Sequence, residues 1–209
     1  VRRLLSDELD RGRADDAFPL RPSRVVADIR SVLGRHDVVL ADTGAVKMWM
    51  ARLYPTYEPN TCLLSNGLSS MGFALPGAIA AKLALPDRGV LAAVGDGAFL
   101  MNSQELETAV REQVPITVLI WQDDAYGLIE WKMDLEIGHH VEVGFTNPDF
   151  VAYAESFGAT GQRVTAAGDL RPMLEEALAA PTVSVIACPV DYAENLRLTD
   201  ALGELTGPF

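Results

Sequence analysis

Two acidic segments, each placed directly after an apolar run of strand length, constrain this chain most. The run GVLAAV, residues 89–94, leads into a Gly-Asp-Gly turn around Asp96, and the run ITVLIW, residues 116–121, leads into Asp123 and Asp124. Continuous apolar runs of this length are typical of buried parallel strands. Ligands of open α/β sheets bind outside the carboxyl ends of such strands, so both acidic segments are predicted to face one crevice. Carboxylate oxygens are ligands that Mg²⁺ prefers.

Similar runs recur along the chain, and helical patterns separate most of them. This alternation predicts an α/β fold with a doubly wound, mostly parallel six-stranded sheet and helices on both faces. The six strands are expected near DVVLA, TCLLS, GVLAAV, ITVLIW, ATGQRV and TVSVIAC.

Polar residues ahead of apolar stripes predict four helix starts, one of them at Asp169. Ser23 is expected to cap a helix, and Asn102 is expected to form a capping box with Glu105. Asn147 with Pro148 is expected to start a further helix.

Composition and charge exclude several classes of protein. The chain has 209 residues, of which 49% are hydrophobic, so it can build one large core. A formal net charge of −12 argues against nucleic acid or an anionic membrane as a partner. No apolar run approaches the roughly 20 residues that cross a bilayer, and no signal peptide is expected. Cys62 and Cys188 lie in apolar runs, which indicates buried free thiols in a reducing cytoplasm.

The chain is expected to divide into two parts of unequal size. Residues 1–18 alternate in charge without a clear apolar stripe, which is typical of a tail or an interdomain linker. Residues 19–209 are expected to form the one folded domain.

The segment from Gly95 to Gly127 resembles the thiamine diphosphate motif, a Gly-Asp-Gly turn followed by an Asn-Asn or Asn-Asp pair. The 24 residues from 98 to 121 leave room for one helix and one strand between the two halves. The resemblance implies that Mg²⁺ is bound by Asp96, Asp123 and the carbonyl of Ala125. Gln122 departs from the usual Asn, and Asp124 leaves the register open by one residue. Asp123 is preferred because Tyr126 and Gly127 line up with the Tyr-Gly of the family.

The resemblance extends over roughly residues 20–209 to the acetolactate synthases, and to the catabolic type in particular. It is carried by DTGAVKMWMARLYPTYEPNTC, LLSNGLSSMGFALPGAIAAKLA, FTNPDFVAYAESFGATG and PVDYAENLRLTDALGELTG. By this resemblance, Met71 wedges between the two rings of the cofactor and the Ser69 carbonyl accepts from its 4′-amino group. The implied cofactor-binding residues are Thr43, Gly44, Ala45, Ser69, Met71, Gly95, Gly97, Ala98, Tyr126, Gly127 and Leu128, with backbone amides of Gly44, Gly97 and Ala98 facing the diphosphate.

Some residues depart from the family or leave alternatives open. Val46 stands where family members often have a His that contacts the diphosphate, so cofactor affinity is expected to differ. Leu128 and Ile129 follow the metal motif and are expected to pass the reactive ring of the cofactor. Trp131 and Lys132 are expected either to face the substrate or to pack the helix, and His139 and His140 to lie in a solvated loop.

The resemblance implies a thiamine diphosphate- and Mg²⁺-dependent enzyme that decarboxylates pyruvate and joins the product to a second 2-keto acid. No catalytic residue is expected in this chain, because the activating glutamate of the family lies on a separate pyrimidine-binding domain. The chain is therefore expected to be a fragment or one subunit, inactive alone, within a cytoplasmic homo-oligomer. FAD would require a further domain and is not favoured. Two alternatives stay open: another thiamine diphosphate-dependent 2-keto-acid decarboxylase or carboligase, and a non-catalytic association module of the same fold.

Overall fold

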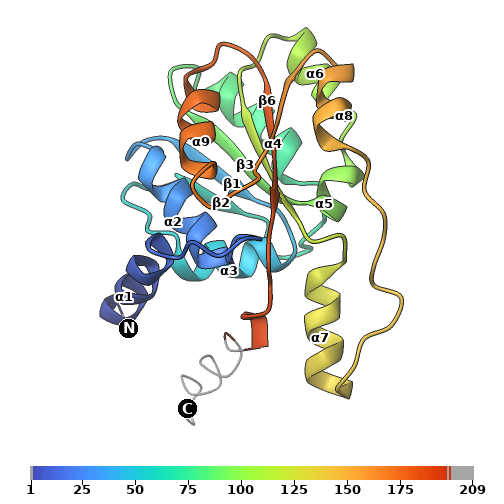
Figure 1. Ribbon diagram of the computed structural model, residues 1–209. Helices are drawn as coiled ribbons and strands as arrows, with labels where there is room; N and C mark the ends of the chain where they lie inside the picture. The colour runs from blue at the N-terminus through green and yellow to red at the C-terminus, as the bar shows by residue number, and fades with distance from the viewer. Residues whose placement is uncertain (1, 197, 199–209) are drawn as a thin grey trace.

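The computed structural model describes residues 2–196 and 198, and strands alternate with helices through that part of the chain (Figure 1). The strands are β1 (Val38–Ala41), β2 (Cys62–Leu64), β3 (Val90–Gly95), β4 (Thr117–Gln122), β5 (Thr160–Arg163) and β6 (Ser184–Pro189). The helices are α1 (Arg2–Arg13), α2 (Pro22–Val32), α3 (Ala45–Leu53), α4 (Ala74–Ala84), α5 (Asp96–Met101), α6 (Glu105–Arg111), α7 (Gly127–Ile137), α8 (Phe150–Ser156) and α9 (Leu170–Ala179).

The strands of the described residues form one sheet in the order β2-β1-β3-β4-β6-β5, and every pairing is parallel. This confirms the doubly wound α/β fold predicted from the six apolar runs. The chain runs from β1 to β2 in one direction and from β3 onward in the other, so the order reverses between β1 and β3. Such a reversal is where open α/β sheets bind ligands, outside the carboxyl ends of the strands.

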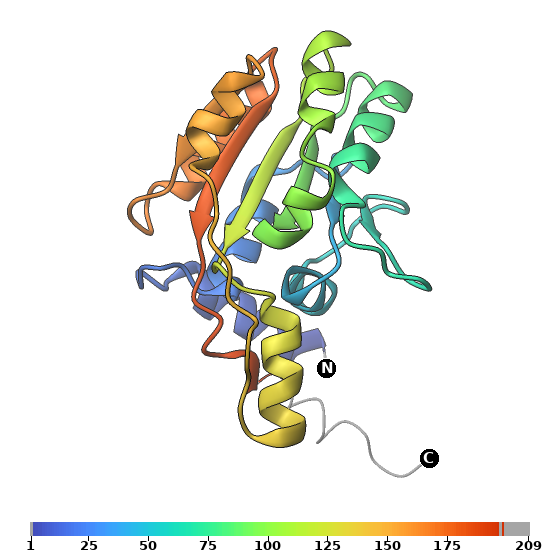
Figure 2. The same ribbon diagram turned by 90° about the vertical axis from the view of Figure 1, so that its right-hand side faces the viewer.

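Helices cover both faces of the sheet and enclose two cores (Figure 2). Helices α2, α3 and α9 pack on one face around side chains such as Trp49, and α4, α5, α6 and α8 pack on the other around Phe150. Successive side chains of a strand point to opposite faces, so Val39 of β1 enters the first core and Leu40 enters the second. Strands buried on both faces explain why the sequence shows continuous rather than alternating apolar runs.

The N-terminal segment is helical over Arg2–Arg13 and packs against α2 and α3. Leu9 is 5% exposed, and a Cβ at Gly12 would meet the carbonyl oxygen of Ser23 at 2.6 Å. Because the helix packs closely at so few positions, its sequence shows little of an apolar stripe. The division into a tail or linker at 1–18 and a domain at 19–209 stays a prediction.

Two of the predicted helix starts are wrong. Ser23 does not cap α2, because Pro22 already occupies its first turn and Ser23 lies buried inside the helix. Asn102 forms no capping box with Glu105; it follows the last residue of α5, and its Nδ2 donates to the Gly72 carbonyl at 2.8 Å. At Ser23 a proline already occupies the first turn of the helix, and at Asn102 a tertiary hydrogen bond replaces the local cap.

The third predicted start, at Asn147, is wrong by three residues. Helix α8 begins at Phe150, and the N-cap is Asp149, whose Oδ1 accepts from the amide of Val151 at 3.0 Å. The side chain of Asn147 is turned toward the crevice instead.

Helix α7 stands beyond the carboxyl ends of the strands, and the chain returns alongside it to α8 (Figures 1 and 2). We call this returning segment, residues 139–149, the strap. Its backbone lies against the start of α7: the amide of Tyr126 donates to the Val143 carbonyl at 2.9 Å, and that of Phe145 donates to the Asp124 carbonyl at 2.9 Å. The strap therefore holds the segment that follows β4.

Both cysteines are free thiols, as predicted. Cys188 is buried in β6 and Cys62 is half-buried in β2. Burial raises the pKa of the Cys62 thiol to about 11, so it is protonated and unreactive near neutral pH.

Candidate functional site

The carboxyl ends of the neighbouring strands β1, β3 and β4 open into one pocket. Of the residues predicted for the site, the pocket is lined by Thr43, Gly44, Ala45, Met71, Gly95, Asp96, Gly97, Ala98, Asp123, Ala125, Tyr126, Gly127 and Leu128. Ser69 lies two residues before Met71 but is not part of the lining. The fold thus brings together residues from segments more than 80 positions apart.

Asp96 lies at the centre of the site and is 1% exposed. Its Oδ1 accepts from the amide of Gly97 at 2.8 Å. Its Oδ2 accepts from the amides of Asp123 at 3.2 Å and Asp124 at 2.8 Å, and from Nδ2 of Asn147 at 2.7 Å. These bonds tie the end of β3 to the segment after β4.

The second acid, Asp123, faces the same pocket as Asp96. Burial and, to a lesser extent, the neighbouring Asp96 carboxylate together raise the pKa of Asp123 to about 8. Two carboxyl groups this close hold a proton between them unless a cation compensates their charge. Hard oxygen donors in such a pair fit Mg²⁺, with the Ala125 carbonyl in the same lining.

This raised pKa predicts a pH-dependent stability in the absence of divalent cations. Folded Asp123 keeps a proton that the unfolded chain loses near pH 4, so the free energy of unfolding falls as pH rises toward the folded pKa near 8. We expect wild type to lose about 1 to 3 kcal/mol relative to Asp123→Asn between roughly pH 5 and 8.5. Urea unfolding of both proteins across that range in EDTA measures the difference, and parallel curves would contradict it.

The two neighbouring acids after β4 lie in different surroundings, and the metal register stays a prediction. Asp123 lines the pocket, whereas Asp124 does not. Oδ1 of Asp124 instead accepts from Nε2 of Gln122 at 2.9 Å and from Nδ2 of Asn147 at 2.6 Å. Oε1 of Gln122 in turn accepts from Nη1 of Arg163 at 3.1 Å. Gln122 therefore connects the end of β5 to the site.

Two glycine turns lead into helices that start at the pocket. Gly44 has a φ of 138°, a conformation that favours glycine, and precedes α3. Free amides at a helix N-terminus favour an anion. Thr43, next to this turn, has a buried hydroxyl oxygen without a hydrogen-bond partner. The amide of Gly97, however, already donates to Asp96, so it is less available to a diphosphate than predicted.

The loop that carries Met71 is held by Asp42, an acid that is 0% exposed. Oδ1 of Asp42 accepts from the amides of Thr43 at 2.7 Å and Gly72 at 3.0 Å, and Oδ2 accepts from that of Ala74 at 2.7 Å. Burial raises the pKa of Asp42, and these amides lower it. Asp42 thus joins the turn after β1 to the Met71 loop.

A lysine supports the other end of the same loop. Nζ of Lys47 donates to the Ser65 carbonyl at 3.2 Å and to Oγ of Ser69 at 3.1 Å. Leu68, between these two serines, is 95% exposed. The tip of the loop therefore projects from a firmly held base.

Two contributors to the site were not predicted from the sequence. Asn147 was interpreted as a helix start, and Tyr192 was quoted within a resemblance but given no role. Tyr192 lines the pocket and stacks on Trp121 at a centroid distance of 6.4 Å. Both reach the site through tertiary contacts that leave no local sequence pattern.

The residues of α7 whose roles were left open lie in different surroundings. Ile129 lines the pocket with Leu128, and their place beside the reactive ring of the cofactor stays a prediction. Trp131 is 5% exposed and belongs to a core, whereas Lys132 pairs with Glu136 at the surface. Of the two histidines, both exposed, His140 has its Nδ1 2.8 Å from Oδ1 of Asp134.

Across residues 2–196 and 198, no helix is long and apolar enough to cross a membrane. The bilayer thickness requires about 20 apolar residues in one helix.

Comparison with known proteins identifies the family. The family model "Thiamine pyrophosphate enzyme, C-terminal TPP binding domain" matches residues 42–188. An acetolactate synthase of Bacillus subtilis is 39% identical over 186 residues, which cover 89% of this chain and 32% of that protein. A catabolic acetolactate synthase of Raoultella terrigena is 37% identical over 192 residues, covering 92% and 34% respectively.

A solved structure shares the fold. The thiamine diphosphate-dependent 4-hydroxybenzoylformate decarboxylase of Rhodococcus jostii RHA1 superposes with a TM-score of 0.77 at 24% identity, over 84% of this chain and 33% of that one. The chain spans about a third of the length of the curated relatives that it matches. From the match over residues 42–188, the chain belongs to the C-terminal TPP-binding domains of the thiamine pyrophosphate enzymes.

Proposed function

We propose that this chain is the diphosphate- and Mg²⁺-binding domain of a cytoplasmic acetolactate synthase. The enzyme would decarboxylate pyruvate and join the product to a second 2-keto acid. The observation that carries the proposal is the pocket in which the Asp96 and Asp123 carboxyl groups lie beside an unpartnered Thr43 hydroxyl and the start of α3. Relatives named as acetolactate synthases support the choice of reaction.

Each part of the pocket has a role in this proposal. Asp96, Asp123 and the Ala125 carbonyl would hold Mg²⁺, which neutralises the diphosphate. The Thr43 hydroxyl and the amides at the start of α3 would donate to diphosphate oxygens. Met71, set by the loop that Asp42 fastens, would support the bend between the two rings of the cofactor. The cofactor itself supplies the carbanion chemistry, and these residues bind and orient it.

Val46 is the residue near the proposed diphosphate site at which this chain departs from the family. Its side chain is 1% exposed, belongs to the core and lines the pocket. It offers no hydrogen bond where the family often has an imidazole. The Thr43 hydroxyl, unpartnered and nearby in sequence, provides a donor on the same turn.

Exposed apolar side chains at the mouth of the pocket indicate a surface that a partner domain would cover. Of the residues that line the pocket, Ile129 is 53% exposed and Tyr126 is 40% exposed. Apolar side chains gathered at a binding site mark an interaction surface. We infer that the pyrimidine-binding domain, which would bring the activating glutamate, covers this mouth from the same enzyme or from a neighbouring subunit.

Calorimetry tests the cofactor proposal directly. Thiamine diphosphate is titrated into the chain with Mg²⁺ and again with EDTA, and we expect binding only with Mg²⁺, because two carboxylates face the diphosphate. Binding of equal strength in EDTA would contradict the metal site. Product analysis of the complete enzyme with pyruvate alone then tests the reaction: acetolactate supports it, and release of acetaldehyde alone indicates a decarboxylase.

A further inference from the structure

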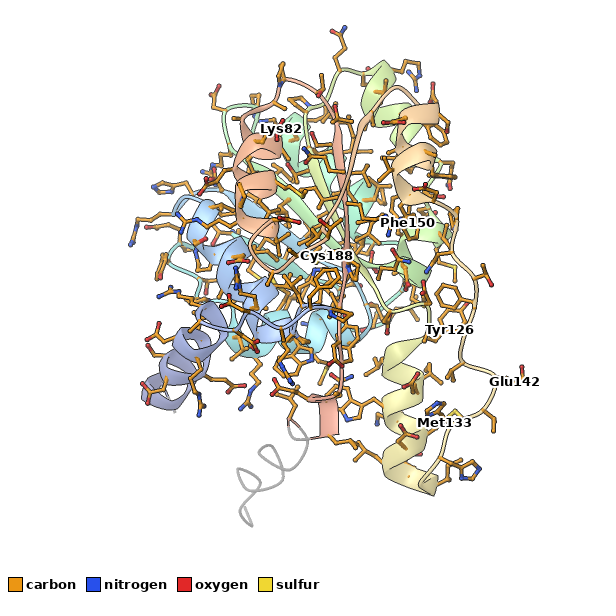
Figure 3. The ribbon with its side chains drawn as sticks, viewed as in Figure 1. Lys82, Tyr126, Met133, Glu142, Phe150 and Cys188 are labelled. Atoms are coloured by element: carbon orange, nitrogen blue, oxygen red, sulfur yellow. The ribbon has the colours of Figure 1, made fainter. Side chains whose placement is uncertain are left out.

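The strap is fastened to the segment that supplies two of the proposed metal ligands. Residues Ala125 and Gly144 form an antiparallel bridge, and hydrogen bonds flank it on both sides. The rings of Tyr126 and Phe145 lie against each other with centroids 4.9 Å apart, and Figure 3 shows Tyr126 at the head of α7. The position of the Ala125 carbonyl is thus fixed by the strap and not by β4 alone.

Asn147, at the end of the strap, reaches both acidic segments at once. Its Nδ2 donates to Oδ2 of Asp96 at 2.7 Å and to Oδ1 of Asp124 at 2.6 Å. Ionised carboxylates only accept hydrogen bonds, so the amide nitrogen, not the amide oxygen, must face them. The orientation of this side chain is therefore dictated by the two acids.

The donors are distributed unequally over the two oxygens of Asp96. Among the residues that the structure describes, Oδ2 takes three of them, from the amides of Asp123 and Asp124 and from Asn147, whereas Oδ1 takes one, from the amide of Gly97. A carboxylate oxygen offers about two lone-pair positions. Oδ2 is consequently saturated, and Oδ1 keeps acceptor capacity for a cation.

We propose that Asn147 is a positioning residue for the metal site, which holds the Asp96 carboxylate so that one oxygen stays available to Mg²⁺. This inference rests on the proposed function, since it assumes that Asp96 is a metal ligand. Asn147 would not touch the metal or the substrate. It would act through Asp96, and through Asp124 it would keep the second acid of the pair away from the pocket.

The neighbouring Asp149 provides a matched control on the same strap. Its Oδ1 accepts from the amides of Val151 at 3.0 Å and Ala152 at 3.4 Å, which caps α8. It makes no hydrogen bond to Asp96 or Asp123 among the residues that the structure describes. Asp149→Ala therefore removes the cap of α8 and an ion pair with Nη2 of Arg163 at 3.6 Å, two residues from Asn147, and removes no contact to Asp96 or Asp123.

The test measures metal affinity and folding separately. Thiamine diphosphate is kept constant, Mn²⁺ is titrated into the full chain as a paramagnetic probe for Mg²⁺, and free Mn²⁺ is measured by electron paramagnetic resonance. Loss of a residue that orients a metal ligand typically costs about 10- to 100-fold in metal affinity, and we expect a loss in that range for Asn147→Ala. We expect a loss also for the isosteric Asn147→Asp, because its carboxylate cannot donate to Asp96 and repels it from the orientation that Asn147 holds. The urea midpoint without metal should fall in Asp149→Ala, whose metal affinity should stay that of wild type.

The outcomes separate the two proposals. Wild type that binds no Mn²⁺ would overturn the metal site and this inference with it. Wild-type binding that is unchanged in both Asn147 variants would overturn only the role of Asn147. Equal losses of affinity in Asp149→Ala and Asn147→Ala, in proportion to their urea midpoints, would show that the strap is merely structural and would also overturn it.

Discussion

Asp42→Ala is expected to lower the free energy of unfolding by about 3 kcal/mol, because it strands three amides that this buried carboxylate now accepts. An unsatisfied buried donor costs about 1 to 3 kcal/mol, and the sum for three such donors exceeds the stability that the variant gains by removing a buried acid. The gain comes from removing an acid whose pKa burial has raised. Urea unfolding at neutral pH measures the net effect.

The conservative variant Asp42→Asn distinguishes this explanation from a simple packing defect. The asparagine oxygen can still accept from Thr43 and Gly72, but its amide nitrogen faces the amide of Ala74 in place of an acceptor. We expect a loss of about 1 to 2 kcal/mol, clearly less than in the alanine variant. Equal losses in the two variants would refute the hydrogen-bond account. Losses below about 0.5 kcal/mol in both would show that Asp42 does not hold the Met71 loop.

The sheet could be predicted because its strands are buried on both faces. GVLAAV and ITVLIW became β3 and β4, each within one residue of the predicted run. Parallel pairing then placed the residues after these strands side by side, which is why Asp96 and Asp123 meet as predicted. Spacing alone does not say which acid of a pair enters the crevice.

Helix starts were predictable only where local chemistry decides them. Ser23, Asn102 and Asn147 have the residue types that cap helices, yet none of them does so. Asn102 and Asn147 instead bond to groups 30 and 51 positions away. A side chain with a tertiary partner follows that partner, and a single sequence does not reveal it.

The same limit applies to the candidate site. Asp96 and Asp123 could be placed from a glycine turn and strand ends, which leave patterns in the sequence, and the other lining residues were implied by the resemblance to the family. Asn147 and Tyr192 belong to segments that return to the site after intervening elements, and their packing against Asp96 and Trp121 is set by the whole fold. The strap itself has no regular secondary structure, so no hydrophobic periodicity in the sequence predicts it.

Asp96→Asn and Asp123→Asn should each weaken Mg²⁺-dependent binding of thiamine diphosphate by at least about 100-fold, since each removes a charged oxygen from the proposed metal site. A loss of that size corresponds to about 2.8 kcal/mol of binding free energy. Calorimetric titration in the presence of Mg²⁺ measures it. Both variants keep the shape of the side chain, but an asparagine at position 96 turns its amide nitrogen toward a donor from which Asp96 now accepts, so urea unfolding of both variants checks that the loss concerns binding and not folding.

Asp124→Asn is the matched control, because this residue lies one position further and outside the pocket lining. Its φ of 57° is a conformation that asparagine tolerates well. The amide oxygen of asparagine can still accept from Gln122 and Asn147. We expect binding within about threefold of wild type, as for a substitution that leaves the metal ligands in place.

A reversed result for this pair of variants would be as informative as the expected one. If Asp124→Asn abolished metal-dependent binding and Asp123→Asn preserved it, the ligand would be Asp124, and the alignment of Tyr126 and Gly127 with the family would be off by one. That register would require Asp124 to abandon its bonds to Gln122 and Asn147 and to turn its side chain into the pocket. Asp123 needs no such rearrangement, because it already lies beside Gly127, where an added Cβ would overlap its Oδ2. For this reason the geometry favours Asp123 as the ligand, and a glycine at 127 as the residue that leaves room for it.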